Sequence, residues 1–499
     1  MTDKNELRKL KNETREKLRG IELRSYHLDR IDVRLNTYIE SVISDTAGHN
    51  LYELLSIVRF FRLMETYLFK IGEVKKFIVF YESLQFSGLN GRTRYKLTPI
   101  QVFQFANILG FYKTEEKRLI RDALLFVPRK YSKTTSVASL AIYDLLFGDA
   151  NAQSYVAANN YNQAQICFSE IKEILKCLDP KFRHFKINRE QVFNKMQGKT
   201  SFARCLASNA DKLDGLNASM VILDEYSQAD SAALKNVLTS SMGARVNPLT
   251  VVITTASDKL ESPFVDMLES YKAVLRGEID NDFIFAHIFE PDVDDAEDDP
   301  RTWGKVQPHL GVTVQADYYE NEYRKAQMNA DDMMTFRTKL LNMFVQNTGK
   351  IWFTSSEVEA MSRNDDDLCS LKGRPDAMVA VDLSVCDDFS AVSYTVYMPD
   401  ARNFHIHTDY YFPEGALKDH PNRELYKKWA DAGHLRLLPG NVIDYRLIAD
   451  DINRRNREQI CILAIGYDPY KSMEFVNIMS ASGAQKGLTP ISQTYGSFS

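Results

Sequence analysis

The sequence lacks several features that would define its class at once. It has six cysteines in 499 residues and no Cys-x-x-Cys pair, which excludes the common zinc and disulfide frameworks. Scattered thiols are typical of a reducing cytoplasm. No apolar run approaches the roughly 20 residues that a membrane-spanning helix needs, and the charged N-terminus has no signal-peptide core. We therefore expect an intracellular protein with no membrane contact.

Nor is there an excess of positive charge. Lys and Arg number 62 and Asp and Glu 67, so the formal net charge is −5. Overall charge therefore does not indicate a nucleic-acid partner, but it leaves room for a local basic surface. Hydrophobic residues make up 44% of the chain, an ordinary fraction that predicts sizeable buried cores. The length corresponds to about three structural units.

Changes in periodicity divide the chain into four expected parts. Residues 1–90 have the spacing of helices with one buried face. Residues 91–290 alternate short apolar runs with helical stretches, which predicts a doubly wound, mainly parallel α/β sheet. Residues 291–370 form an acidic loop, PDVDDAEDDP, and a helical connector, and residues 371–499 form a second α/β unit. We expect the acidic loop to be exposed to solvent.

The expected strands are mainly apolar runs of four to nine residues. In the two α/β parts they are Ala123–Val127, Ser154–Ala157, Met220–Leu223, Thr250–Thr254, Met378–Leu383, Ser390–Val396, Asn403–Tyr411 and Ile460–Tyr467.

A phosphate-binding loop follows the first of these strands. The segment Pro128–Thr135, PRKYSKTT, lies between a strand and an apolar helix, which is the context that a P-loop requires. Lys133 occupies the position that reaches the β- and γ-phosphates, and the Thr134 hydroxyl the position that binds Mg²⁺. Backbone N–H groups at the helix N-terminus add to anion binding. The motif departs from the GxxxxGK[ST] consensus because Val127 and Ser132 replace glycines, and by itself it fits a basic helix start equally well.

Two later strand ends support the same function. Asp224 and Glu225 end an apolar strand in the manner of a Walker B motif, where the Asp supports Mg²⁺ and the Glu orients or deprotonates water. Thr254 and Thr255 end the next strand, where P-loop motors sense the γ-phosphate. In isolation these pairs also fit a helix cap and a polar strand end. Gln101, upstream of the sheet, is either an adenine-reading residue or an ordinary surface residue.

In this order the motifs resemble the large terminase subunits of tailed bacteriophages. The segments that carry the resemblance are LTPIQVFQFANILGF, VPRKYSKTTS, SYVAANNYNQAQICF, LASNADKLDGLNASMVILDEYSQ and VVITTAS, and it covers about residues 50–499. It implies a P-loop ATPase that drives viral DNA packaging, followed by an RNase H-like nuclease that cuts concatemeric DNA. It also implies ATP and Mg²⁺ as cofactors. The implied partners are double-stranded viral DNA, a portal protein, a small terminase subunit and further copies in a ring, in the cytoplasm of the infected bacterial host.

The resemblance also implies roles for single residues. The implied ATP-binding residues are Gln101, Arg129, Lys130, Tyr131, Ser132, Lys133, Thr134 and Thr135. Arg129 matches the arginine within the family's Walker A motif and would stabilise the transferring phosphoryl group. Glu225 matches the catalytic carboxylate, and Thr254 and Thr255 match the coupling motif.

Acidic residues at strand ends indicate a second site. Asp382 ends one expected strand, Asp388 follows six residues later, and Asp468 ends a later strand. Carboxylates at neighbouring strand ends can hold two divalent ions, with Mg²⁺ or Mn²⁺ preferred. Singly, Asp388 fits a hairpin turn and Asp468 fits a turn before Pro469. By resemblance Asp382 and Asp468 are the first two metal acids and Asp388 is a secondary candidate.

Two further considerations limit this interpretation. The family places a third acidic motif on a C-terminal helix, and the sequence ends at Ser499 without one, so we expect weak metal binding and uncertain cleavage. Two other functions stay open: a P-loop DNA translocase outside phage packaging, and a degenerate prophage remnant with an inactive nuclease. Helicase motifs are absent after the coupling segment, and the complete Walker residues argue against decay of the motor half.

Overall fold

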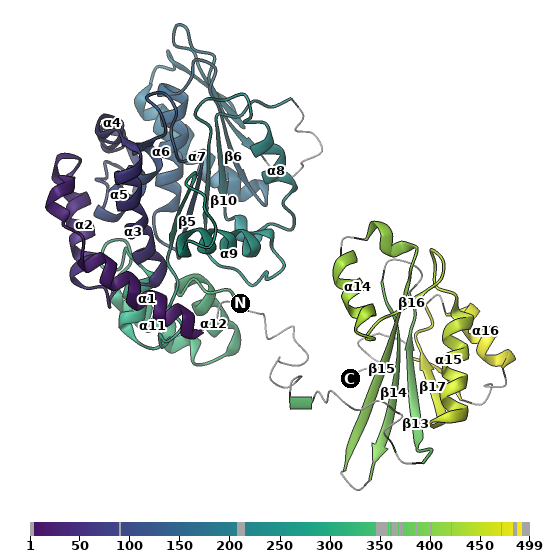
Figure 1. Ribbon diagram of the computed structural model, residues 1–499. Helices are drawn as coiled ribbons and strands as arrows, with labels where there is room; N and C mark the ends of the chain where they lie inside the picture. The colour runs from purple at the N-terminus through teal and green to yellow at the C-terminus, as the bar shows by residue number, and fades with distance from the viewer. Residues whose placement is uncertain are drawn as a thin grey trace. The chain divides into compact units, whose positions relative to one another are not determined.

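Alternating apolar runs and helices build the larger part of the molecule around one sheet (Figure 1). The computed structural model describes residues 4–88, 91–206, 215–345, 358, 360–361, 368, 371, 373–384, 388–399, 402–420, 422–470, 472–482 and 487–491. Contacts divide the chain into two units, Met1–Trp352 and Phe353–Ser499. Within the described residues, no helix is both long and apolar enough to cross a membrane.

The sheet of the first unit has eight strands, and its six-strand parallel part confirms the predicted doubly wound fold. In spatial order the strands are β12 (Ile284–Ile288), β5 (Asp122–Phe126), β11 (Leu249–Thr254), β10 (Met220–Asp224), β6 (Gln153–Ala158), β9 (Phe202–Leu206), β8 (Gln191–Asn194) and β7 (Phe185–Ile187). The last two form a hairpin that pairs antiparallel with β9 at one edge.

Helices cover both faces of this sheet because successive strand residues point to opposite sides. Ile222 of β10 packs in one core with α5, α6 and α7, whereas its neighbour Leu223 packs in a second core with α8 and α9. The helices of the unit are α1 (Lys4–Arg19), α2 (Val33–Ser44), α3 (Leu51–Thr66), α4 (Ile71–Ser83), α5 (Pro99–Gly110), α6 (Lys133–Phe147), α7 (Tyr161–Leu178), α8 (Ala233–Ser240), α9 (Pro263–Arg276), α10 (Pro300–Val306), α11 (Ala316–Ala326), α12 (Ala330–Thr335) and the π-helix η5 (Phe336–Leu340).

Short elements complete the first unit. They are the 3₁₀ turns η1 (Leu23–Tyr26), η2 (Leu28–Arg30) and η4 (Tyr226–Gln228), and the strand pairs β1 (Leu68–Phe69) with β4 (Phe111–Tyr112) and β2 (Phe86–Gly88) with β3 (Gly91–Thr93).

The acidic stretch 291–300 is a hub of ion pairs and not simply an exposed loop. The Asp292 carboxylate accepts a hydrogen bond from the Leu51 backbone N–H at the start of α3 (2.8 Å) and pairs with Lys11 of α1. Lys305 of α10 lies 3.4 Å from the same carboxylate and 2.5 Å from Asp295. The like charges of this stretch are therefore compensated by cations from two helices and by the N-terminus of a third.

The second unit contains a six-stranded mixed sheet, in agreement with the predicted RNase H-like fold. Its strands, in spatial order, are β16 (Arg436–Leu438), β15 (Asn403–Pro413), β14 (Ser390–Met398), β13 (Asp376–Asp382), β17 (Cys461–Tyr467) and β18 (Leu488–Pro490), and its helical elements are η8 (Ala416–Asp419), α14 (Arg423–Asp431), α15 (Tyr445–Glu458) and α16 (Met473–Ala481). The middle three strands are antiparallel, and β17 runs parallel to β13. Ile448 of α15 and Phe475 of α16 pack on the inner sheet face with Val379 and Tyr394.

Candidate active sites

The P-loop lies between β5 and α6, as the sequence predicts. Lys130 and Ser132 both have left-handed backbone conformations, with φ of 69° and 68°. Ser132 directly precedes α6 and stands where the consensus has glycine. Glycine adopts this conformation without steric cost, whereas a residue with a Cβ pays for it. Ser132 therefore has, at the position of the consensus glycine, a backbone conformation that glycine favours.

Three predicted residues from three segments meet beside this loop. The Lys133 ammonium lies 2.6 Å from a carboxylate oxygen of Glu225 and also donates to the Thr255 hydroxyl. The Thr255 hydroxyl in turn donates to the Val127 carbonyl, 3.0 Å away, at the end of β5. In parallel sheets ligands bind at the carboxyl ends of the strands, and β5, β10 and β11 all end here.

Asp224 carries an unsatisfied carboxylate oxygen. Its Oδ1 is buried and has no hydrogen-bond partner among the described residues. Burial, followed by the neighbouring charge of Glu225, raises the pKa of Asp224 to about 6. A buried carboxylate oxygen without a partner is costly. A bound cation would remove that cost, so the site fits the divalent ion that Walker B motifs support.

Thr254 and Thr255 face different partners. Thr254 is fully buried, and its hydroxyl accepts a hydrogen bond from the Ser227 N–H (3.1 Å), just after the Walker B residues. The Ser227 hydroxyl donates to the Thr255 carbonyl at 2.6 Å. The end of β11 is therefore hydrogen-bonded on two sides. Thr255 bonds to Lys133 of the P-loop, and both threonines bond to Ser227 in the turn that follows Glu225.

Two other residues predicted to bind ATP have side chains that are buried and bonded within the protein. The Tyr131 side chain is fully buried and points into the core, where its hydroxyl donates to Gln104 (2.8 Å). Gln101 is 3% exposed, and its amide oxygen accepts from the Thr98 N–H in a capping box at the start of α5. Arg129 is exposed.

Sequence analysis did not identify the segment 307–339, whose residues hydrogen-bond to the backbone of the P-loop. The Arg129 N–H donates to the Lys339 carbonyl (3.0 Å), and the Arg129 carbonyl accepts from the Gln307 side chain (2.8 Å). The Thr313 hydroxyl donates to the Lys130 carbonyl (2.5 Å). No local motif could have indicated these residues, because they lie about 180 to 210 positions away in the sequence.

The second candidate site lies at the ends of two neighbouring parallel strands. Val381 of β13 is in register with Tyr467 of β17, so Asp382 and Asp468 occupy adjacent positions at the carboxyl edge. Asp388 lies just before β14, the other neighbour of β13, and its carboxylate accepts the Phe389 N–H. The described residues contain no group of three or more His, Cys, Asp or Glu side chains close enough to hold a metal ion. The register thus places two acidic positions at neighbouring strand ends, and the Asp468 carboxylate accepts the Tyr470 N–H at 2.9 Å, as in the turn before Pro469.

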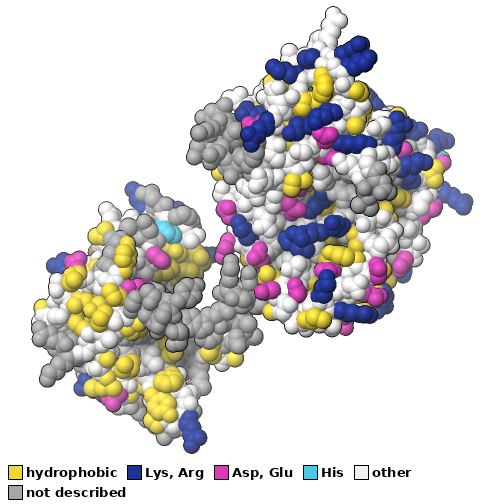
Figure 2. Space-filling view, turned by 180° about the vertical axis from the view of Figure 1, so that it is seen from behind, with side chains coloured by type: hydrophobic (Ala, Val, Ile, Leu, Met, Phe, Trp, Pro, Cys, Tyr) yellow, Lys and Arg dark blue, Asp and Glu magenta, His cyan; other side chains and the backbone are white. Residues whose placement is uncertain are grey.

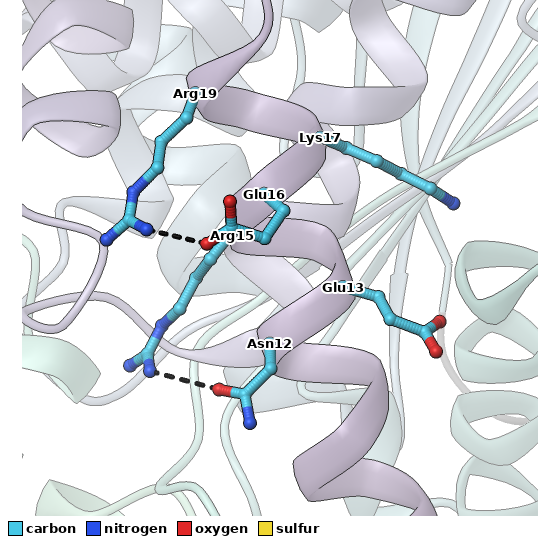
Figure 3. Close-up of a pocket in the computed structure, with 6 residues that line it drawn as sticks. All are labelled: Asn12, Glu13, Arg15, Glu16, Lys17 and Arg19. Atoms are coloured by element: carbon cyan, nitrogen blue, oxygen red, sulfur yellow. Dashed lines mark hydrogen bonds and ion pairs between the residues drawn. The ribbon is translucent and has the colours of Figure 1, made fainter.

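A surface hollow along α1 holds none of the predicted site residues. It is lined by side chains of this one helix: Asn12, Glu13, Arg15, Glu16, Lys17 and Arg19. Figure 3 shows them projecting from the helix, with Arg19 paired to Glu16 and Arg15 donating to Asn12. These are local pairs on a solvated helix. A second hollow beside Asp224, also lined by Asn159 and Asp230, adjoins the Walker B site.

Two family profiles match most of the chain. The first is described as the terminase large subunit ATPase domain and matches residues 99–273, and the second as the terminase large subunit endonuclease domain and matches residues 278–499. The chain belongs to the terminase large subunits. This terminase thus combines an ATPase and an endonuclease, which use a nucleotide and divalent metal ions, and the predicted family is confirmed.

Individual relatives are distant. The chain is 27% identical over 253 residues to the protein YmfN of Escherichia coli K12, a match that covers 49% of this chain and 55% of YmfN. It is 22% identical over 431 residues to the terminase large subunit of Lactococcus phage p2, a match that covers 84% of this chain and 78% of the phage protein. The large terminase of bacteriophage HK97 shares the fold, with a TM-score of 0.50 at 21% identity and coverage of 85% and 86%.

Proposed function

We propose that this terminase hydrolyses ATP at the P-loop and uses the energy to move double-stranded viral DNA into a capsid. The observation that carries the ATPase assignment is the meeting of Lys133, Glu225 and Thr255 at the ends of three parallel strands. Membership of the terminase family, whose models include an ATPase and an endonuclease domain, supports packaging as the purpose.

Each residue then has a distinct task. Lys133 binds the β- and γ-phosphates, and the N–H groups at the start of α6 add to the positive potential there. Arg129 stabilises negative charge on the transferring phosphoryl group. Thr134 and Asp224 would hold Mg²⁺, which when bound neutralises phosphate charge. Glu225 orients and deprotonates the attacking water.

The ion pair between Lys133 and Glu225 suggests how the proposed base is held before nucleotide binds. At 2.6 Å the ammonium occupies one oxygen of the carboxylate that should act on water. Phosphate oxygens compete for the same ammonium, so ATP binding draws Lys133 away from Glu225. The carboxylate is then released to act as the base only when substrate is present.

For the nuclease we propose that Asp382 and Asp468 bind Mg²⁺ or Mn²⁺, with Asp388 as an additional candidate. Their support is the strand register that places Asp382 beside Asp468. Hard carboxylate oxygens suit these ions. Calorimetric titration of Mn²⁺ into the wild-type chain and into Asp382→Asn tests the assignment, and equal binding by both would contradict it.

We place one contact with DNA on the hairpin β7–β8 and its flanks. Five cations, Lys181, Arg183, Lys186, Lys195 and Lys199, fall within 19 residues, and within the described chain none is paired with a carboxylate. Four of them are exposed. Figure 2 shows many dark blue and few magenta side chains on the upper part of the first unit, to which this hairpin belongs. In a chain of net charge −5, such a local basic surface favours a polyanion.

The remaining partners follow from the family. We propose a portal protein and a small terminase subunit as partners, a ring of identical copies as the working state, and action in the cytoplasm of the infected bacterium.

The decisive experiment compares Mg²⁺-dependent ATP turnover by the wild-type chain and by Glu225→Ala. We expect the variant to lose turnover and keep nucleotide binding, because Lys133 and the loop backbone are unchanged. Lys133→Ala should lose binding itself. Turnover by Glu225→Ala at the wild-type rate would contradict the assignment of the base.

A further inference from the structure

The end of β11 is held from outside by a segment that sequence motifs do not mark. The Lys339 ammonium donates to the Ala256 carbonyl at 2.8 Å, and the Asn342 side-chain oxygen accepts from the Ala256 N–H at 2.8 Å. Both hydrogen-bonding groups of one residue are therefore bound by side chains three positions apart. Ala256 directly follows Thr255, the residue whose hydroxyl receives Lys133.

The same short segment also holds the P-loop. The Lys339 carbonyl accepts the Arg129 N–H at 3.0 Å. Lys339 belongs to η5, a π-helical turn, and such turns are rare and often found at functional sites. Through its backbone and its side chain, Lys339 thus connects the loop that carries Arg129 to the strand end that carries Thr255.

Asn342 is under backbone strain that its side chain offsets. Its φ is 55°, in the left-handed region, and it is fully buried. Its amide N–H₂ donates to the Phe289 carbonyl at 2.7 Å while its oxygen holds Ala256. Strained conformations persist where surrounding bonds over-determine them, and they gather at functional sites.

Lys339 also stands in an electrostatic setting that a scaffold residue has no reason to occupy. Burial lowers its pKa, and the positive charges of Arg129 and Lys133 lower it further, while Glu225 opposes them. An apolar or amide side chain would avoid these costs. The ammonium is thus retained next to the groups that bind and cleave ATP.

We propose that Lys339 and Asn342 are positioning residues for ATP hydrolysis. Acting on Ala256, they hold Thr255 where it orients Lys133 and Glu225, and Lys339 ties this arrangement to the backbone of Arg129. Neither residue needs to touch the nucleotide. The proposal rests on the proposed ATPase function and adds a control of that site by the segment 307–342.

The test measures kcat and KM for ATP in the full chain carrying Lys339→Met, Lys339→Arg or Asn342→Ala. A misplacement of catalytic groups that leaves substrate contacts intact lowers kcat and spares KM. We expect kcat to fall about tenfold or more in Lys339→Met and Asn342→Ala, with KM within about threefold of wild type. Lys339→Arg should restore most of the rate, because it keeps a charged donor. Lys325→Met, an exposed lysine of α11 paired with Glu322, serves as the control and should match wild type.

The outcomes separate this proposal from the ATPase assignment. An inactive wild-type chain that binds no nucleotide would remove the ATPase function and this proposal with it. An active wild type with an equally active Lys339→Met would overturn the positioning role alone. The positioning role would also be overturned if Lys339→Met lost activity because it no longer binds ADP, and if Lys339→Arg did not restore that activity. Should Lys339→Met not fold, Asn342→Ala and Lys339→Arg decide by the same criteria.

Discussion

Ser132 shows how a single position can depart from a consensus and keep its structure. Its φ of 68° is the conformation that glycine takes in this loop. We expect Ser132→Gly to keep ATP turnover and to leave the free energy of unfolding within about 1 kcal/mol of wild type, since relief of strain and added chain entropy oppose each other. A β-branched residue is far less tolerant, so Ser132→Val should cost about 1–3 kcal/mol and weaken ATP binding.

Urea unfolding and nucleotide titration check this pair of variants. Ser270→Val, at an exposed position within α9, makes the same chemical change on ordinary helical backbone. Equal effects at positions 132 and 270 would show that the left-handed backbone is not what restricts position 132.

His287 makes stability depend on pH. Its side chain is fully buried between Tyr38 of α2 and Gln104 of α5, and burial lowers its pKa from 6.5 to about 4, although Glu53 raises it. The unfolded chain therefore takes up a proton below pH 6.5 that the folded chain accepts only near pH 4. Stability contributed by neutral His287 is present above pH 6.5 and is lost as the pH falls toward 4.

The size of this effect follows from the same shift. Each tenfold difference in proton affinity is worth about 1.4 kcal/mol, so the loss approaches roughly 3 kcal/mol. Urea unfolding at pH 7.5, 5.5 and 4.5 measures it. His287→Gln should be less stable at pH 7.5 but should lose less on acidification. An unchanged pH slope in His287→Gln would rule this histidine out as the cause.

Residue identity along the sequence was sufficient to find the chemistry at strand ends but not the contacts that support it. Lys133, Glu225 and Thr255 are each marked by a strand that precedes or follows them, and the structure brings them together. The roles of these residues stay predictions until they are tested. Tyr131 and Gln101 show the limit: a loop or motif position does not reveal whether a side chain faces substrate or core, since that depends on packing partners such as Gln104 and Thr98.

Among elements, the stretch 291–300 contributes to stability through compensated charge. Asp292 is 13% exposed and lies among Lys11, Lys305 and the start of α3. Removing one member of a buried ion-pair cluster leaves uncompensated charge, so Asp292→Asn should lower the free energy of unfolding by about 3 kcal/mol. Asp294, two positions away, pairs with Arg8 in the open, at 54% exposure. Asp294→Asn should change stability little, because exposed pairs are screened by water.

Urea unfolding followed by circular dichroism compares the two asparagine variants. The prediction fails if Asp294→Asn is as destabilising as Asp292→Asn, because burial would then not decide the effect.

In the first unit, periodicity located the four central strands β5, β6, β10 and β11 and missed β7, β8, β9 and β12. Strands β5, β6, β10 and β11 are almost wholly buried, and such strands are continuous apolar runs in the sequence. Strands β7 and β8 alternate buried and less buried positions over only three and four residues, too few for a periodicity to be read. The expected helical connector within 291–370 includes the helices Ala316–Ala326, Ala330–Thr335 and Phe336–Leu340. The four-part division of the chain stays a prediction.

At the scale of the whole molecule, the charge distribution has to reconcile a net charge of −5 with a polyanionic partner. Cations that neutralise DNA phosphates release counterions, and each lost contact reduces the slope of log affinity against log salt by about 0.9. The combined substitution of Lys181, Arg183, Lys186 and Lys195 by Gln should therefore weaken duplex DNA binding by the full chain. We also expect it to flatten its salt dependence by up to about 3.6.

A control variant with the same change in net charge distinguishes a local DNA contact at the hairpin from a general effect of the protein's total charge on DNA binding. Lys4, Lys9, Lys17 and Lys325 are exposed and lie outside the hairpin, and their substitution by Gln should leave the slope nearly unchanged because distant exposed charges are screened beyond about 10 Å at 0.1 M salt. Fluorescence anisotropy of a labelled duplex between roughly 50 and 200 mM salt measures both variants. If the two sets reduce the slope equally, DNA senses only total charge. If neither does, the hairpin serves another partner, and the DNA contact must be sought elsewhere on the molecule.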